Sequence, residues 1–133
     1  MTTAWLDANV VLRFLTKEPV SLAQRANRLF AKAHAGEIAL RLTPVVVAEI
    51  AWALRSIYGR RPAEIAAGLS ALLRADGILV EERDELLEAL ELMVQANVSF
   101  PDAFLAISAR QADEPVCTFD ADFKRLGVGI LGS

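Results

Sequence analysis

Five acidic side chains lie in four short stretches of the chain that are otherwise mostly apolar. They are Asp7 in WLDANVVLRFL, Glu49 in TPVVVAEIAWAL, Asp102 in SFPDAFLAISAR, and Asp120 and Asp122 in VCTFDADFKRLGV. If they converge, two carboxylates about 5 Å apart repel by roughly 3 kcal/mol at an effective dielectric near 20. A divalent cation removes this repulsion, and oxygen ligands without Cys or His favour Mg²⁺ or Mn²⁺ over zinc. Such an ion lowers the pKa of a bound water and holds phosphate oxygens, which is the chemistry of phosphodiester hydrolysis.

Glu49 is the acid that an ordinary structural role explains least. In a helix starting at Pro44, all its neighbours three and four residues away are apolar: Val45, Val46, Trp52 and Ala53. Because burying an unpaired charge costs several kcal/mol, either Glu49 has a partner elsewhere or this side of the helix is not buried. The other acids have simpler alternatives: Asp7 and Asp120 as helix N-caps, and Asp102 as a charge near a positive helix end.

The elements that would position these acids alternate between strand and helix. Hydrophobic spacing predicts strands at residues 3–7, 37–42, 77–80, 115–119 and, as a fifth, 128–131. It predicts helices at residues 8–15, 19–35, 44–57, 62–75, 83–96, 100–112 and 120–126, with Thr43 and Ser99 as N-caps. Since no hairpin turn joins adjacent strands, we expect an α/β fold in a single domain, residues 1–133. Its mainly parallel central sheet of four or five strands would carry helices on both faces.

Two details of burial follow from the same pattern. The first strand, residues 3–7, is apolar and is expected to be buried. The helix after Pro19 should turn Leu22, Ala26, Leu29, Phe30 and Ala33 toward the core.

In parallel sheets functional groups gather outside the carboxyl ends of the strands, and Asp7 and Asp120 follow two such ends.

Composition narrows the class of protein. Residues 1–66 carry a balance of +4 and residues 67–133 a balance of −7, so a basic face beside an acidic site is compatible with the net charge of −3. The single cysteine, Cys117, permits no internal disulfide and fits a reducing cytoplasm. No window reaches the roughly 20 uncharged residues of a membrane span, so we expect no membrane contact. His34, the only histidine, lies mid-helix, which leaves no Ser/His/Asp set.

The four acidic stretches resemble, in order and spacing, the four motifs of PIN-domain proteins, from Ala4 to about Val128. The length is similar to that of the VapC-type toxins of toxin–antitoxin pairs. The resemblance implies a metal-dependent endoribonuclease whose Mg²⁺ or Mn²⁺ is held by the four family acids, Asp7, Glu49, Asp102 and Asp120. By the same resemblance Asp122 stands where an additional acid often occurs, and Asn9 and Thr118 are polar residues that position the ligands. Ser99 stands where some members carry a further acid, which puts a second ion in doubt.

The resemblance also implies partners. Such toxins form homodimers and are silenced by a small antitoxin protein that lays a segment across the active-site groove, often with a basic residue reaching the acids. The antitoxin could make apolar contacts with Trp52, Leu54 and Tyr58, although packing in the core also explains why these residues are apolar. Cations near the expected site could contact the RNA backbone: Arg13, Lys17, Arg55 and Arg60.

Two other functions compete with the nuclease. A PIN-like fold could act as a catalytically silent binding module, its acids serving as caps and ion pairs, with a protein partner carrying the effect. A phosphoacceptor switch would use Asp7 or Asp120 as the phosphorylated residue, but no lysine ends a strand as such a switch requires. Which RNA would be cut is open, since specificity would come from the shape of the groove.

Overall fold

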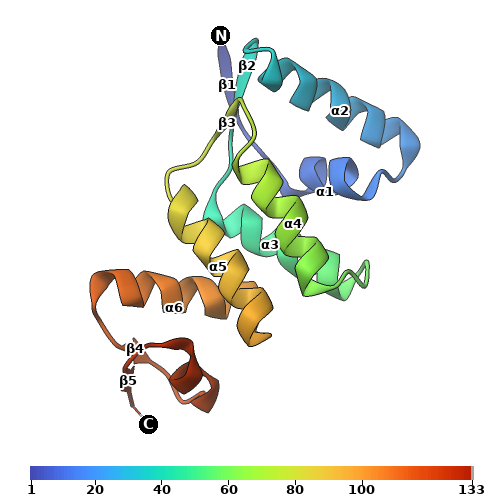
Figure 1. The fold of residues 1–133 in the computed structure, drawn as a ribbon. Helices are drawn as coiled ribbons and strands as arrows, with labels where there is room; N and C mark the ends of the chain where they lie inside the picture. The colour runs from blue at the N-terminus through green and yellow to red at the C-terminus, as the bar shows by residue number, and fades with distance from the viewer. Residues whose placement is uncertain (133) are drawn as a thin grey trace. The chain divides into compact units, whose positions relative to one another are not determined.

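The computed structural model describes residues 1–132 and shows two compact units (Figure 1). Unit 1 is Met1–Glu82, and unit 2 is the chain from Arg83 onward. Every strand pair among the described residues is parallel, in a three-stranded sheet and a two-stranded sheet. The α/β class and the parallel pairing are therefore confirmed, with the five strands divided between the two sheets.

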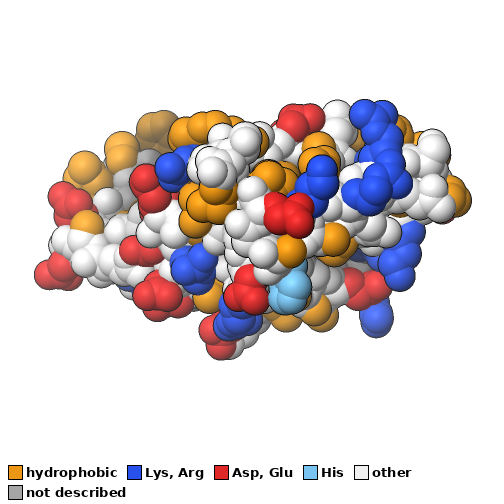
Figure 2. Space-filling view, turned by 90° about the horizontal axis from the view of Figure 1, so that it is seen from above, with side chains coloured by type: hydrophobic (Ala, Val, Ile, Leu, Met, Phe, Trp, Pro, Cys, Tyr) orange, Lys and Arg blue, Asp and Glu red, His pale blue; other side chains and the backbone are white. Residues whose placement is uncertain are grey.

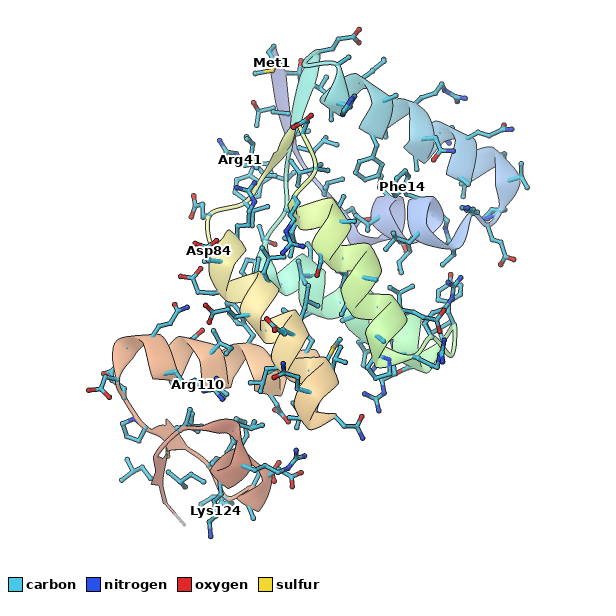
Figure 3. All side chains as sticks on the ribbon, in the orientation of Figure 1. Met1, Phe14, Arg41, Asp84, Arg110 and Lys124 are labelled. Atoms are coloured by element: carbon cyan, nitrogen blue, oxygen red, sulfur yellow. The ribbon has the colours of Figure 1, made fainter. Side chains whose placement is uncertain are left out.

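The sheet of unit 1 has the order β1-β2-β3, from Thr2–Trp5, Ile38–Arg41 and Ile78–Leu79. At its carboxyl edge Trp5 pairs with Arg41, and Arg41 pairs with Leu79. The Arg41 guanidinium, labelled in Figure 3, lies over the Trp5 ring at 5.6 Å from its centroid. This cation–π contact joins the two strands at the end from which the chain leaves toward α1 and α3.

Four helices complete unit 1: α1 (Ala8–Thr16), α2 (Val20–His34), α3 (Pro44–Ser56) and α4 (Pro62–Leu73). Helix α1 packs against α2 and α3, α3 packs against α4, and α2 packs against β2. The rings of Phe14 and Phe30 join α1 to α2 at a centroid distance of 4.4 Å. The most deeply buried large side chains of unit 1 come from α1, α3 and α4, and they are Val11, Val47, Ile50, Ile65, Leu69 and Leu73.

Local sequence signals define where the helices begin. Thr43 Oγ1 accepts a hydrogen bond from Val46 N at 3.4 Å, and Pro44 occupies the first turn of α3, as predicted. At the start of α4, Glu64 Oε1 accepts from the backbone N and from Nε of Arg61. The hydrogen bond from the Arg61 side chain is the main cause that lowers the pKa of Glu64.

Unit 2 contains α5 (Arg83–Ala96), α6 (Phe100–Ala112), β4 (Val116–Cys117), the 3₁₀ helix η1 (Ala121–Leu126) and β5 (Ile130–Leu131). Helix α5 packs against α6, and η1 contacts both helices. The predicted N-cap of α6 is confirmed, because Ser99 Oγ accepts from Asp102 N at 3.3 Å. Among residues 1–132, no helix combines the length and the low polarity that crossing a bilayer requires.

One prediction of burial is wrong, and a second is right only in part. All four residues of β1 are exposed, and Trp5 has 72% of its surface accessible. The reason is that β1 is an edge strand of its sheet, and only Leu6, just beyond it, enters the core. On α2 the predicted burial of Ala26 and Ala33 is confirmed, but the larger side chains predicted to point inward, Leu22 and Leu29, are about two-fifths exposed. Leu22 is four residues before Ala26 and Leu29 three residues after it, so both leucines lie at the edge of the same face and line a groove together with Ala26.

Arginine side chains attach η1 to the two helices of unit 2. Arg110 of α6, labelled in Figure 3, donates through Nε to Leu126 O at 2.7 Å and also through Nη2. Arg125 donates to Ala96 O at the end of α5. Gly127 follows with φ +76°, and a Cβ at this position would come within 2.7 Å of Arg110 Nη2. The segment that carries Asp120 and Asp122 is therefore held against the helix that carries Asp102.

We expect Gly127→Ala to destabilise unit 2 in two ways. A left-handed conformation with a Cβ costs about 1 kcal/mol, and displacing Arg110 from its carbonyl partner adds about 1 kcal/mol more. Urea denaturation followed by circular dichroism measures the sum. Gly59→Ala is the control for the backbone cost alone, because Gly59 has φ +64° and a Cβ added there would meet no atom within 4 Å. The part of the destabilisation that exceeds the Gly59→Ala control should disappear in an Arg110→Ala background. If it persists there, the clash with Arg110 is not its cause.

Candidate metal centre

Asp7 follows β1 and is the N-cap residue of α1. Its backbone has the extended geometry of a cap, with φ −89° and ψ 146°, but its side chain makes no capping hydrogen bond to any residue that the structure describes. The side chain is exposed. The carboxylate of Asp7 is therefore not used for helix capping, which was the simplest structural explanation for this acid, and it remains available to bind a metal ion.

Glu49 lies in the middle of α3 and is exposed. Its neighbours Val45 and Trp52 are 79% and 62% exposed. Glu49 can therefore lie among apolar residues without being buried, because the strip of α3 that carries Val45, Glu49 and Trp52 is exposed, although its neighbour Ala53 is buried. The opposite side carries the core residues Val47, Ile50 and Leu54.

Asp102 lies in the first turn of α6, where its backbone N–H is the group that Ser99 caps. The side chain of Asp102 is half-buried. A carboxylate in this position is favoured by the positive end of the helix dipole. The structural role suggested by the sequence and a role as a ligand are both compatible with this placement.

Asp120 and Asp122 belong to a small ladder of local hydrogen bonds after β4. Thr118 Oγ1 accepts from Asp120 N at 2.9 Å, and Asp120 Oδ1 accepts from Asp122 N at 2.9 Å. Asp122 Oδ1 is 4.0 Å from Arg125 Nε. Asp120 thus caps η1 with one oxygen, and Thr118 orients the backbone that carries it.

The predicted RNA-contacting cations and Asn9 all lie in unit 1. Arg13 is half-buried, and its Nη1 donates to Tyr58 OH at 3.1 Å and to Glu18 O at 3.3 Å. Lys17 is the exposed C-cap of α1. Arg55 is exposed in the last turn of α3, and Arg60 is partly exposed in the loop after it. Asn9, on the first turn of α1, is exposed and lines a groove with Arg13.

Of the apolar residues expected to receive a partner, Trp52 alone is on the surface. Leu54 is only 4% exposed and belongs to the core. Tyr58 is partly buried and accepts the hydrogen bond from Arg13. His34, expected mid-helix, is the exposed last residue of α2, with Nδ1 3.5 Å from Asp76 Oδ2.

The five candidate ligands are divided between the units, Asp7 and Glu49 in unit 1 and Asp102, Asp120 and Asp122 in unit 2. Among residues 1–132, no three Asp, Glu, His or Cys side chains form a group that could hold a metal ion. The convergence of the acids therefore stays a prediction. Arg110, whose side chain holds η1 in place, was not identified from the sequence. The only sign of this role in the sequence is a long cationic side chain near the end of α6.

The family to which the chain belongs follows from one family model. The PIN domain model matches residues 4–129, a span that includes all five candidate acids and both units. A search of curated proteins finds no match. PIN domains are generally nucleases and typically use divalent metal ions, so the comparison supports a nuclease. With nearly its whole length matched, the chain belongs to the PIN-domain family.

Proposed function

We propose that the protein is a Mg²⁺- or Mn²⁺-dependent endoribonuclease, with Asp7, Glu49, Asp102 and Asp120 as its metal ligands. The observation that carries this proposal is the family match over residues 4–129, which spans every one of these acids. The order of the acids along the chain supports it, because each follows a strand or lies in a helix, and their motifs resemble those of PIN-domain proteins.

The chemistry of the donor set fits such an ion. All proposed ligands are carboxylates, which suit hard cations, and Asp7, Glu49 and Asp120 are exposed to solvent. When bound, the ion would supply a Lewis acid that lowers the pKa of a water and stabilises charge on the phosphate. The uncapped carboxylate of Asp7 can meet the ion without loss of a helix-capping bond.

The remaining polar residues would position these ligands and the substrate. Thr118 orients the backbone of Asp120, and the backbone N–H of Asp122 donates to one oxygen of Asp120, so the other oxygen can face an ion. Asn9 would steady the side chain of Asp7 from the first turn of α1. Arg13, Lys17, Arg55 and Arg60 would contact phosphates of the RNA, which positions the strand without reading its sequence.

We further propose that the protein is the toxin of a toxin–antitoxin pair, forms a homodimer and works in the cytoplasm. The exposed apolar residues of α3 support a protein partner at this place. Val45 and Trp52 flank Glu49, so a small antitoxin that covers them also covers a proposed ligand. A basic side chain from that antitoxin would pair with the acids and block cleavage.

Substituting Asp7→Asn should lower RNA cleavage at least ~100-fold, more than the loss of a residue that only supports a ligand. The fold should survive, because the Asp7 side chain makes no capping bond within the described chain. Gel assays of labelled RNA with Mn²⁺ measure cleavage, and thermal melting measures the fold. Asp76→Asn is the matched control, an exposed acid of unit 1 outside the four acidic motifs. Equal activity of the Asp7 and Asp76 variants would count against the site.

Metal removal tests the enzyme against the silent binding module. We expect EDTA to stop cleavage of structured RNA, and added Mn²⁺ or Mg²⁺ to restore it. Ca²⁺ should restore little cleavage, because its bonds to oxygen are longer and its coordination geometry is more flexible. Cleavage rates across a metal titration provide the measurement. A binding module would show RNA or protein binding but no cleavage at any metal concentration, and that result would replace the nuclease proposal.

A further inference from the structure

The two helices after Asp7 differ from the rest of the chain in charge. Residues 8–34, which form α1, α2 and their connection, contain five Lys and Arg residues and one acid, Glu18, so they carry +4. The whole chain carries −3, so the remainder carries −7. Neither α1 nor α2 contains an acidic residue. The α1–α2 hairpin therefore carries a net positive charge in an acidic protein, and its one acid, Glu18, lies in the connection between the helices.

A groove runs between the two helices and begins close to the first proposed ligand. It has a volume of about 260 Å³, and its polar lining is Asn9, Arg13 and Arg25. Asn9 is two residues beyond Asp7 in the chain, at the start of α1. The apolar part of the lining includes Leu22 and Leu29, the two partly exposed leucines of α2. A chain bound in this groove would start near Asp7 and meet arginines from both helices.

The positive charge continues along α2 beyond the groove. Arg25, Arg28 and Lys32 are spaced by three and four residues, so they share one side of the helix, and all three are exposed. From Arg25 to Lys32 the helix rises about 10 Å. Figure 2 shows Lys and Arg side chains gathered on the part of the surface where α2 lies. Three cations in line without intervening acids suit a polymer with regularly spaced phosphates.

We infer that this basic track, defined as Arg25, Arg28 and Lys32 together with the α1–α2 groove, binds the phosphate backbone of the RNA substrate. The inference rests on the proposed ribonuclease activity and adds residues that the sequence did not single out. The track would hold the strand on one side of the cleavage site and supply affinity without base recognition. An acidic peptide is the competing occupant, but it would need its acids spaced to match three cations on one helical face.

The experiment compares two variants with the same change in net charge. The first is Arg25→Gln/Arg28→Gln/Lys32→Gln, and the second is Arg61→Gln/Arg74→Gln/Lys124→Gln, whose residues lie outside the track. Fluorescence anisotropy of a short labelled RNA, in EDTA so that no cleavage occurs, gives Kd over a salt series. We expect the track variant to bind roughly tenfold or more weakly at low salt and its salt slope to fall by about 2, at ~0.7 per lost phosphate contact. The control variant should stay near wild type, and circular dichroism should show both folded.

Three outcomes overturn the inference. Equal weakening of both variants means that net charge alone matters, and unchanged binding by the track variant means that the RNA lies elsewhere. If the track variant loses binding of labelled polyglutamate but keeps binding of RNA, the basic track belongs to an acidic protein partner. Because binding is measured without metal, the result is separate from the nuclease proposal: RNA that binds the track but is not cut with Mn²⁺ overturns the enzyme and keeps the track.

Discussion

Parallel pairing of the strands is the constraint on which the placement of the acids depends. Parallel neighbours run in the same direction, so their carboxyl ends lie at one edge and each strand must be followed by a crossover. In unit 1, β1 leads into Asp7 and β2 leads into Thr43 and the helix of Glu49, at the same edge of the sheet. In unit 2, β4 leads into Thr118 and Asp120. An antiparallel hairpin would have sent successive strand ends to opposite edges.

Local signals made much of this fold predictable from the sequence. Helix α5 has the predicted bounds, residues 83–96, because its apolar spacing is strong. The starts of α3 and α6 were predictable because Thr43 and Ser99 are capping residues with a proline in the turn that follows. The ends of short strands were less predictable: β3, β4 and β5 have two residues each, where longer runs were expected. Strand length depends on pairing with neighbours, which a single segment does not contain.

Burial was harder to predict than secondary structure, because it depends on which side of an element another element covers. The apolar composition of β1 suggested a buried strand, but β1 forms the edge of its sheet and all four of its residues are exposed. On α2 the alanines are buried while Leu22 and Leu29, at the edge of the same face, stay partly exposed, a difference that hydrophobic spacing alone does not show. The candidate acids themselves were found from sequence order. Their hydrogen bonds, such as the one between Thr118 and Asp120, required coordinates.

Net charge is a poor guide to whether this protein can bind a polyanion. At physiological ionic strength the Debye length is about 8 Å, so a phosphate on α2 is attracted mainly by the cations beside it and only weakly repelled by acids elsewhere. Arg25, Arg28 and Lys32 have no acid on their own helix to offset them. The acids of the proposed centre repel an RNA strand only until an ion neutralises them, since the ion is then the largest local charge. An acidic protein with a basic α1–α2 hairpin can therefore hold RNA there while its metal ligands remain carboxylates.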